Sequence, residues 1–248
     1  MIIVKSQAEI ERMRVPCRMV AEFHEMMREQ VKPGSTTREL NEVAEKHCRD
    51  NNAVPAFKGY GGFPYAICSS PNEAVVHGFA NDKPLRDGDI LSLDFGVKYD
   101  GFYGDAAVTF AVGTVNAEKQ LLMDKTEASL YAGLDTIRPG VHLSDVSAAI
   151  QKVAEGAGFS VVREFVGHGI GRDLHEDPQI PNYGKPGNGP ILKKGMVLAI
   201  EPMINAGSRQ VKILTDGWTA VTQDGRPSAH FEHTVAVTED GYEILTCV

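Results

Sequence analysis

The sequence predicts an α/β fold of the α+β kind, in which antiparallel strands and separate helices form two related halves. Three observations support this prediction: helix-start signals near the N-terminus, a β-hairpin pattern over residues 88–112, and short segments of the first half that recur in the second. The chain has 248 residues, of which 42% are hydrophobic. This length suits one large globular domain with a substantial core, or two fused halves.

Four helices are expected along the chain, the last of them a helical stretch that follows residues 137–140 and ends near Gly158. Residues 6–9 (Ser-Gln-Ala-Glu) form a capping box, and apolar residues spaced three and four apart follow it, as on a helix with one buried face. Pro16 lies inside this helix and should kink or break it. Residues 36–39 carry the helix-start signal again, and Asn116 should cap a third helix that runs to about Thr136.

The segment 88–112 has the pattern of a β-hairpin with one carboxylate on each arm. Apolar and polar residues alternate on both sides of Asp100-Gly101, a dipeptide typical of two-residue hairpin turns. This turn would place Asp94 and Asp105 on one sheet face as diagonal neighbours, about 7–8 Å apart or closer. Two such carboxylates repel unless a cation lies between them, and a pair of divalent metal ions would fit. The alternative is two solvent-exposed aspartates on an edge hairpin.

Four short segments of the first half recur in the same order in the second half. The recurrences align residues of like chemistry: Asp94 with Glu201, Asp105 with Glu232, and His77 with His168. The pattern indicates a duplicated half, so we expect a single domain, 1–248, with pseudo-twofold halves at roughly 1–115 and 116–248. Stacking the two sheets would bring four carboxylates together, and such a cluster requires cations.

The candidate ligands form an oxygen-rich set with one nitrogen: Asp94, Asp105, His168, Glu201 and Glu232. This set suits two moderately hard divalent ions such as Mn, Fe(II) or Co better than a tetrahedral structural zinc. His168 lies in the sequence Gly-His-Gly-Ile-Gly, where its small neighbours leave the imidazole accessible.

Composition narrows the class of protein further. The net charge of −8 and a pI of about 5.5 argue against a general nucleic-acid or anionic-membrane binder. The 4 cysteines show no metal-type spacing, which indicates reduced thiols in a cytoplasmic protein. The N-terminal residues carry charges that a signal peptide would lack, and no apolar run reaches the roughly 18 residues of a membrane span.

The order and contexts of the five ligand-type residues resemble those of type I methionine aminopeptidases, metallopeptidases of the pita-bread fold. The segments that carry the resemblance are Gly-His-Gly-Ile-Gly, Leu-His-Glu-Asp-Pro and Phe-Glu-His-Thr. The resemblance covers essentially the whole chain. The short spacings between His168, Glu201 and Glu232 leave no room for the helical insertion of type II enzymes. We also expect no extra N-terminal domain of the prolidase kind.

The resemblance implies roles for the site residues. Asp105 and Glu232 would bridge both metals, Asp94 would hold one, and His168 with Glu201 would hold the other. A water or hydroxide between the metals would be the nucleophile, and Glu201 would be the general base. His77 and His175 would flank the scissile amide and contact the carbonyl oxygen or the substrate backbone.

The resemblance also implies a substrate pocket and partners. The methionine pocket would be lined by Tyr60, Phe63, Cys68, Leu174 and Trp218, together with His77 and His175. A monovalent cation would lie near Asn72 and Ser228. The implied activity is removal of the initiator methionine from nascent polypeptides with a small second residue, by a monomer working near the ribosome exit.

Two other functions stay open at this point. One is an exopeptidase of the prolidase or aminopeptidase P kind with the same fold. The other is a non-catalytic binding module of the fold. Such a module would be expected to lose ligand residues, whereas this chain has all five.

Overall fold

The structure is a computed structural model that describes all 248 residues. The helices are α1 (Gln7–Gln30), α2 (Thr37–Asp50), the 3₁₀ helix η1 (Tyr60–Gly62), α3 (Ala117–Leu134) and α4 (Leu143–Gly156). The strands of the first half are β1 (Val54–Pro55), β2 (Ile67–Pro71), β3 (Ala74–Val76), β4 (Ile90–Tyr99) and β5 (Phe102–Ala111). Those of the second half are β6 (Ser160–Val161), β7 (Gly167–Gly169), β8 (Glu176–Ile180), β9 (Val197–Ile200), β10 (Met203–Asn205), β11 (Val211–Ile213), β12 (Ala220–Thr222), β13 (Ser228–His230), β14 (Glu232–Val237) and β15 (Tyr242–Ile244).

A 9-stranded sheet forms the centre of the molecule, with the strand order β1-β4-β5-β14-β9-β7-β8. β2 pairs with β4 and β15 pairs with β14 beside this path. Two 3-stranded sheets, β13-β10-β6 and β11-β12-β3, complete the strand structure. Every strand pair is antiparallel, as the alternating sequence pattern predicts.

The hairpin of β4 and β5 has the predicted register. Asp94 lies opposite Ala107 and Asp105 lies opposite Gly96, so the two carboxylates share one sheet face. The turn residues Asp100 and Gly101 have φ values of 49° and 78°. Two consecutive positive φ angles are the signature of a type I′ turn, whose twist matches that of the strands.

The two halves join edge to edge and are not stacked. β5 of the first half pairs with β14 of the second, with Glu232 opposite Ala107, so strands of both halves belong to one continuous sheet. The expected stacking of two sheets is therefore wrong. Edge pairing still brings the carboxylates together, because neighbouring strands lie only about 4.7–4.9 Å apart and cross-strand neighbours share a face.

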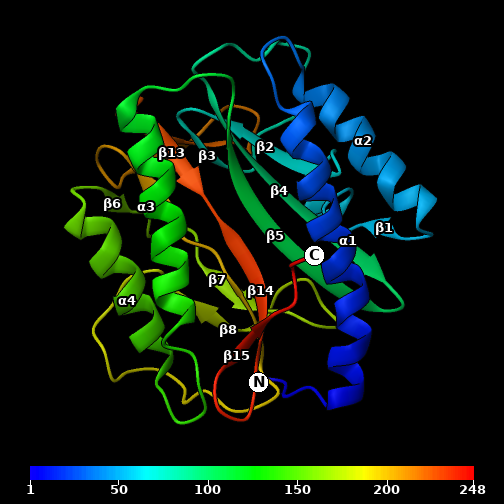
Figure 1. Cartoon of the computed structure of the whole chain (residues 1–248), viewed down its shortest axis with the longest axis vertical. Coiled ribbons are helices and arrows are strands. Elements are labelled where there is room, and N and C mark those ends of the chain that lie inside the picture. The colour runs from blue at the N-terminus through cyan, green and yellow to red at the C-terminus, as the bar shows by residue number, and fades with distance from the viewer.

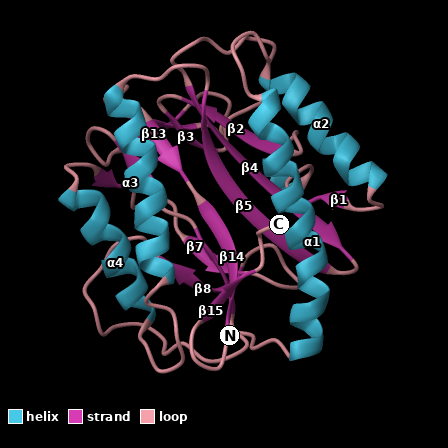
Figure 2. Cartoon of the chain, in the orientation of Figure 1, coloured by secondary structure: helices cyan, strands magenta, loops and turns pink.

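Each half carries a helix pair on the sheet. Figure 1 shows α1 and α2 over the right-hand part of the sheet, beside β4 and β5, and α3 and α4 over the left-hand part. Figure 2 shows the same layering, with helices on the outside and strands at the centre. None of these helices combines the length and apolar character needed to span a membrane.

The helix starts agree with the sequence predictions. Ser6 and Thr36 are N-caps whose side chains accept a hydrogen bond from the backbone N–H three residues on, and both form capping boxes. Asn116 caps α3 in the same way. The expected break at Pro16 is wrong, because α1 continues without interruption to Gln30. Apolar side chains on both sides of Pro16 are buried, and this packing outweighs the one backbone hydrogen bond that proline removes.

The contact between α1 and β5 makes a prediction about Gly104. A Cβ atom at Gly104 would lie 2.5 Å from the backbone nitrogen of Cys17 and 2.7 Å from its Cα. Gly104→Ala should therefore push α1 off the sheet and lower the free energy of unfolding by about 1–3 kcal/mol. Urea denaturation measures this change. The control is Gly156→Ala in α4, where nothing lies within 4 Å of the added Cβ and stability should not fall. Equal effects of the two substitutions would contradict the close packing at Gly104.

Candidate active site

The sheet register lines up a row of side chains on one face. Cys68 on β2 lies opposite Asp94 on β4, Asp94 lies opposite Ala107 on β5, and Ala107 lies opposite Glu232 on β14. Cross-strand neighbours project from the same face, so these four residues lie side by side. Only the small side chain of Ala107 lies between Asp94 and Glu232 in this row.

Three further ligand-type residues converge on this row. Asp105 lies two positions along β5 from Ala107, His168 lies on β7, and Glu201 directly follows β9. The ligand atoms of Asp105, His168 and Glu232 all lie within 4.8 Å of one another. The Nε2 atom of His168 lies 3.5 Å from Oε1 of Glu201. The fold thus brings together all five residues that the sequence predicted as ligands.

The cluster has the electrostatics of a cation site. Three buried carboxylate oxygens have no hydrogen-bond partner: Oδ1 of Asp94, Oδ1 of Asp105 and Oε1 of Glu232. No lysine or arginine lines the cavity into which these residues face. Buried carboxylates without cationic partners are strongly unfavourable, whereas oxygens with free lone pairs are the ligands that divalent ions such as Mn²⁺ prefer. The residues therefore fit a divalent metal centre.

The pKa values of the four carboxyl groups show how closely these buried acids lie together. Burial raises the pKa of Asp105 and Glu232 well above the usual range, and neighbouring carboxylates raise both further. Burial and the charge of Asp94 also raise the pKa of Glu201. The pKa of Asp94 rises from 3.8 to about 7 because its carboxyl group is buried.

His168 is prepared for coordination. Burial lowers its pKa to about 4, with nearby His175 adding to the shift, so the imidazole is neutral near pH 7. Its Nδ1 atom lies 2.9 Å from the carbonyl oxygen of Gly169. A proton on Nδ1 that is donated to this oxygen leaves the lone pair of Nε2 facing the carboxylates.

The carboxylates form one wall of a cavity of about 250 Å³. Its lining contains every residue that the sequence analysis placed in the catalytic, metal and substrate sites: Tyr60, Phe63, Cys68, His77, Asp94, Asp105, His168, Leu174, His175, Glu201, Trp218 and Glu232. Four more residues line it that the sequence analysis did not single out: Phe57, Val76, Phe165 and Val166. Val76 directly precedes His77, and Phe165-Val166 lie in the segment that leads to His168, so the paired histidine motifs contained a signal for these three.

The apolar part of the cavity is built from rings that meet edge to face. Phe63 packs against Trp218 with ring centroids 5.2 Å apart. Leu174 and Cys68 are buried beside them. Burial raises the pKa of the Cys68 thiol, so this group is neutral. The result is a surface of aromatic, aliphatic and sulfur atoms next to the carboxylates, which suits a thioether side chain.

His77 is held in an unusual backbone conformation. Its φ is 59°, a left-handed value that is costly for a residue other than glycine. The next residue must be glycine, because a Cβ at Gly78 would lie 2.1 Å from the carbonyl oxygen of Ser69. The His77 ring lies edge to face against Phe165, with centroids 5.3 Å apart. Such strain is typical of functional sites, where it aims a side chain into a cavity.

His175 faces the cavity from the loop between β7 and β8. Its Nδ1 atom lies 2.8 Å from the Tyr60 hydroxyl oxygen. Its ring centroid lies 4.4 Å from that of His168. His77 and His175 thus reach the cavity from two different parts of the chain.

His230 is a neighbour of the site that sequence reasoning missed. It is buried on β13, and its Nε2 atom lies 3.8 Å from Oε2 of Glu201 with no hydrogen-bond partner. His230 lies two residues before Glu232, and the period-2 alternation of an extended segment was the signal that could have found it.

Asn72 and Ser228 lie side by side. The backbone N–H of Ser228 donates to the carbonyl oxygen of Asn72 over 2.8 Å. The ammonium group of Lys119 donates to Oδ1 of Asn72 over 2.7 Å, so this side-chain oxygen already has a cationic partner. A monovalent cation at this position stays a prediction.

Comparisons with known proteins agree with this geometry. The model of Metallopeptidase family M24 matches residues 11–239. Methionine aminopeptidase 1 of Bacillus subtilis (strain 168) is 54% identical over 248 residues, which is 100% of both chains. The solved structure of methionine aminopeptidase from Thermotoga maritima has a TM-score of 0.98 at 48% identity and covers 100% of both chains. Prolidase from Pyrococcus furiosus shares the fold, with a TM-score of 0.81 at 24% identity over 99% of this chain and 66% of that one.

The raised pKa of Asp94 predicts that Asp94→Asn stabilises the metal-free protein but destabilises the metal-loaded protein. The carboxyl group has a pKa of about 7 in the fold against 3.8 as the ordinary value, so its ionisation between these pH values destabilises the metal-stripped protein. Asp94→Asn, which resembles the protonated form, should therefore stabilise chelator-treated protein more at pH 8 than at pH 5. The gain should be on the order of a few kcal/mol.

With saturating Mn²⁺ the sign should change, because the substitution removes a ligand and metal binding stabilises only the folded state. Urea denaturation at both pH values, with chelator or with Mn²⁺, gives the four comparisons. A substitution effect independent of pH in the chelated protein would contradict the raised pKa of Asp94.

Proposed function

The chain belongs to metallopeptidase family M24, and we propose that its cavity carries out the reaction of its methionine aminopeptidase relatives, removal of the N-terminal methionine from a polypeptide. The chain is a hydrolase with the pita-bread fold, as the sequence resemblance predicted. One observation carries the proposal. Four carboxylates and a neutral histidine face the same cavity as a thioether-compatible apolar pocket.

The family uses divalent metal ions, and five side chains would hold them here: Asp94, Asp105, His168, Glu201 and Glu232. We propose that these five residues would hold two ions, with Asp105 and Glu232 at the centre of the set and Mn, Fe(II) or Co as the metal by ligand preference. When bound, the ions lower the pKa of a water molecule and polarise the carbonyl group of the first peptide bond. The unpartnered oxygens of Asp94, Asp105 and Glu232 support this assignment.

Glu201 would be the general base. Its carboxylate lies beside His168 and His230, at 3.5 Å and 3.8 Å, on the wall of the cavity. A carboxylate in this place can accept a proton from the attacking water and release it to the leaving amine. The same residue thereby moves the proton in both steps of the hydrolysis.

His77 and His175 would hold the substrate amide. If the Tyr60 hydroxyl donates to Nδ1 of His175, the neutral ring carries its proton on Nε2. That N–H can donate to the carbonyl oxygen as negative charge develops on it. Burial lowers the pKa of His77, so this ring is also neutral and can donate to or accept from the substrate backbone.

The methionine side chain would enter the pocket of Phe63, Cys68, Leu174 and Trp218. His77 and His175 restrict the space beside the scissile bond, which favours a small second residue. The proposed substrates are the N-termini of nascent proteins. We further propose that 1–248 acts as one catalytic domain, as a monomer in the cytoplasm near the ribosome exit, where such substrates emerge.

The alternatives have less support. The prolidase structure shares the fold, but at 24% identity this likeness says nothing about a shared substrate. A non-catalytic module has no need of unpartnered buried carboxylates, whose desolvation costs stability.

The function is tested with a peptide series Met-X-Gly, with X varied from Gly to Trp at fixed metal and pH. A bulky X would shift the carbonyl away from the ligands, and a misplacement of about 1 Å can cost roughly a hundredfold in rate. We expect kcat/KM to be about a hundredfold higher for Met-Ala than for Met-Leu peptides. Leu-Ala and Ala-Pro peptides are the controls. Equal rates across the series, or faster cleavage of the Ala-Pro peptide, would remove the methionine assignment.

Glu201→Gln tests the base. Gln keeps the size of the side chain but cannot accept a proton, so kcat should fall at least about a hundredfold. Metal content is measured on the same sample by elemental analysis, and two bound ions per chain are expected in the wild type. Wild-type turnover by a variant that keeps both ions would show that another group is the base.

A further inference from the structure

The loop between β7 and β8 carries part of the substrate site. It spans residues 170–175, two positions after the candidate ligand His168, and it presents Leu174 and His175 to the cavity. Ile170 and Leu174 are buried in the core, whereas Arg172, Asp173 and His175 are exposed, so core packing does not hold the middle of the loop. Its shape must therefore depend on specific contacts.

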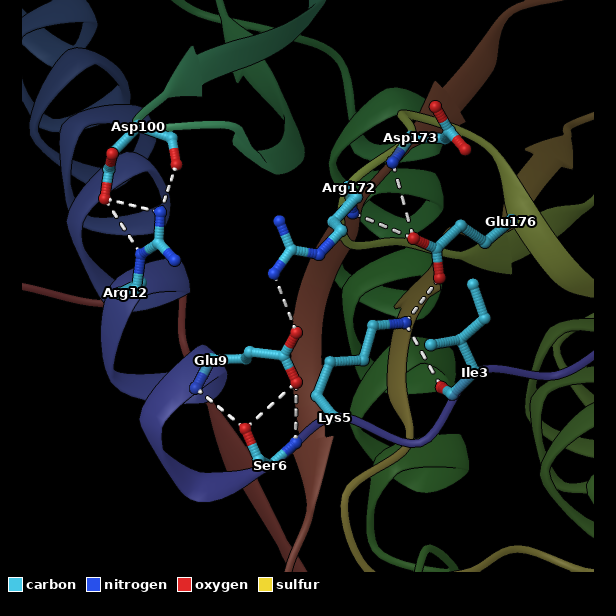
Figure 3. A network of polar contacts seen from close by, with 9 residues as sticks. All are labelled: Ile3, Lys5, Ser6, Glu9, Arg12, Asp100, Arg172, Asp173 and Glu176. Atoms are coloured by element: carbon cyan, nitrogen blue, oxygen red, sulfur yellow. Dashed lines mark hydrogen bonds and ion pairs between the residues drawn. The ribbon is translucent and has the colours of Figure 1, made fainter.

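Glu176, the first residue of β8, closes this loop with its carboxylate (Figure 3). Oε1 accepts hydrogen bonds from the backbone N–H groups of Arg172 at 2.8 Å and Asp173 at 3.4 Å. Oε2 lies 2.5 Å from the ammonium nitrogen of Lys5. The carboxylate thus links two loop amides to a lysine that is far away in the sequence.

The ion pair of Lys5 and Glu176 is buried, with only 3% of each side chain exposed. Lys5 belongs to the segment before α1, and its backbone N–H donates to the carbonyl oxygen of Gly195 at 2.7 Å. Its ammonium group also donates to the carbonyl oxygen of Ile3 at 3.3 Å. Loss of one partner of a buried pair leaves an unpaired buried charge, so each residue requires the other.

Two glycines leave the space that the pair occupies. A Cβ at Gly171 would lie 2.5 Å from Cε of Lys5 and 2.6 Å from Oε1 of Glu176. A Cβ at Gly195 would lie 2.5 Å from the carbonyl oxygen of Lys5. Gly171 is the last glycine of the Gly-His-Gly-Ile-Gly segment that contains His168. This segment therefore contains the candidate metal ligand His168 and also leaves room for the ion pair.

The other ion pairs at this loop are exposed. Arg172 pairs with Glu9, with 58% and 30% of the side chains exposed. The N-terminal ammonium group pairs with Asp177, with 100% and 57% exposed. Exposed pairs contribute little to order. Among the ion pairs at this loop, the buried pair is the one that can fix it, beside the backbone hydrogen bonds of Ile170 and Gly171 to neighbouring strands.

We propose that Lys5 and Glu176 are positioning residues, through which the N-terminal segment holds the loop 170–175 so that Leu174 and His175 face the substrate. The effect on catalysis rests on the proposed function. The effect on the loop does not depend on it.

Three variants separate positioning from stability. Lys5→Met leaves the Glu176 carboxylate buried without its cation. Lys5→Met/Glu176→Met replaces the pair by apolar groups of similar size but removes the acceptor for the loop amides. Lys5→Met/Glu176→Gln also removes both charges but keeps an oxygen for those amides. Lys194→Met is the matched control, because it makes the same change in the exposed pair with Glu239.

The first readout is amide hydrogen exchange of residues 171–175, which needs no activity. Exchange should be at least about tenfold faster in Lys5→Met and in the Met/Met variant. It should be close to wild type in the Met/Gln variant and in Lys194→Met. If Lys5→Met does not fold, the two double variants still give the comparison. Equal exchange in the Met/Met and Met/Gln variants would overturn the proposal.

The second readout is kcat/KM for a Met-Ala peptide at wild-type metal content. It should fall at least about tenfold in Lys5→Met and Met/Met and recover in Met/Gln. In a His175→Ala background, Lys5→Met should cause a smaller further loss than in the wild type, because part of its effect acts through His175 and the rest through Leu174. An additive loss there would overturn the positioning role. A wild type inactive on Met-Ala would instead refute the proposed function, and hydrogen exchange would still decide the role of the pair.

Discussion

Four buried carboxylates on one cavity wall are the constraint on which the rest of the structure depends. Each is pushed toward protonation by burial, and the charges of neighbouring carboxylates raise the pKa values of Asp105, Glu201 and Glu232 further. Such a cluster costs stability in a folded protein unless protons or cations neutralise it. The helix pairs and the sheet therefore serve to hold acidic side chains in positions that no unliganded fold would favour.

Pairing of β5 with β14 supplies the necessary rigidity. It joins the two halves into one sheet and places Asp94 and Glu232 on either side of Ala107. Sheet register permits no gradual adjustment, because a slip by one residue turns each side chain to the other face. The geometry of the candidate metal centre is thereby set by backbone hydrogen bonds.

The proposed substrate contacts come from less regular parts of the chain. His77 follows β3 in a strained conformation, and His175 lies on a loop that the buried pair of Lys5 and Glu176 closes. Loops on a rigid scaffold commonly carry specificity, but each loop then needs its own support. Here a segment at the N-terminus supports a loop in the second half.

The sequence by itself determined the helix starts, the β4–β5 hairpin and the candidate ligand residues. Capping boxes, period-2 alternation and the Asp100-Gly101 turn are local signals, and the recurrence of carboxylates was visible in one chain. Only the tertiary structure decided that the halves join edge to edge, that α1 continues through Pro16, and that His230 lies beside Glu201. The same holds for Lys5 and Glu176, which are 171 residues apart. Local patterns cannot encode such contacts, because they arise from the packing of segments that are distant in the sequence.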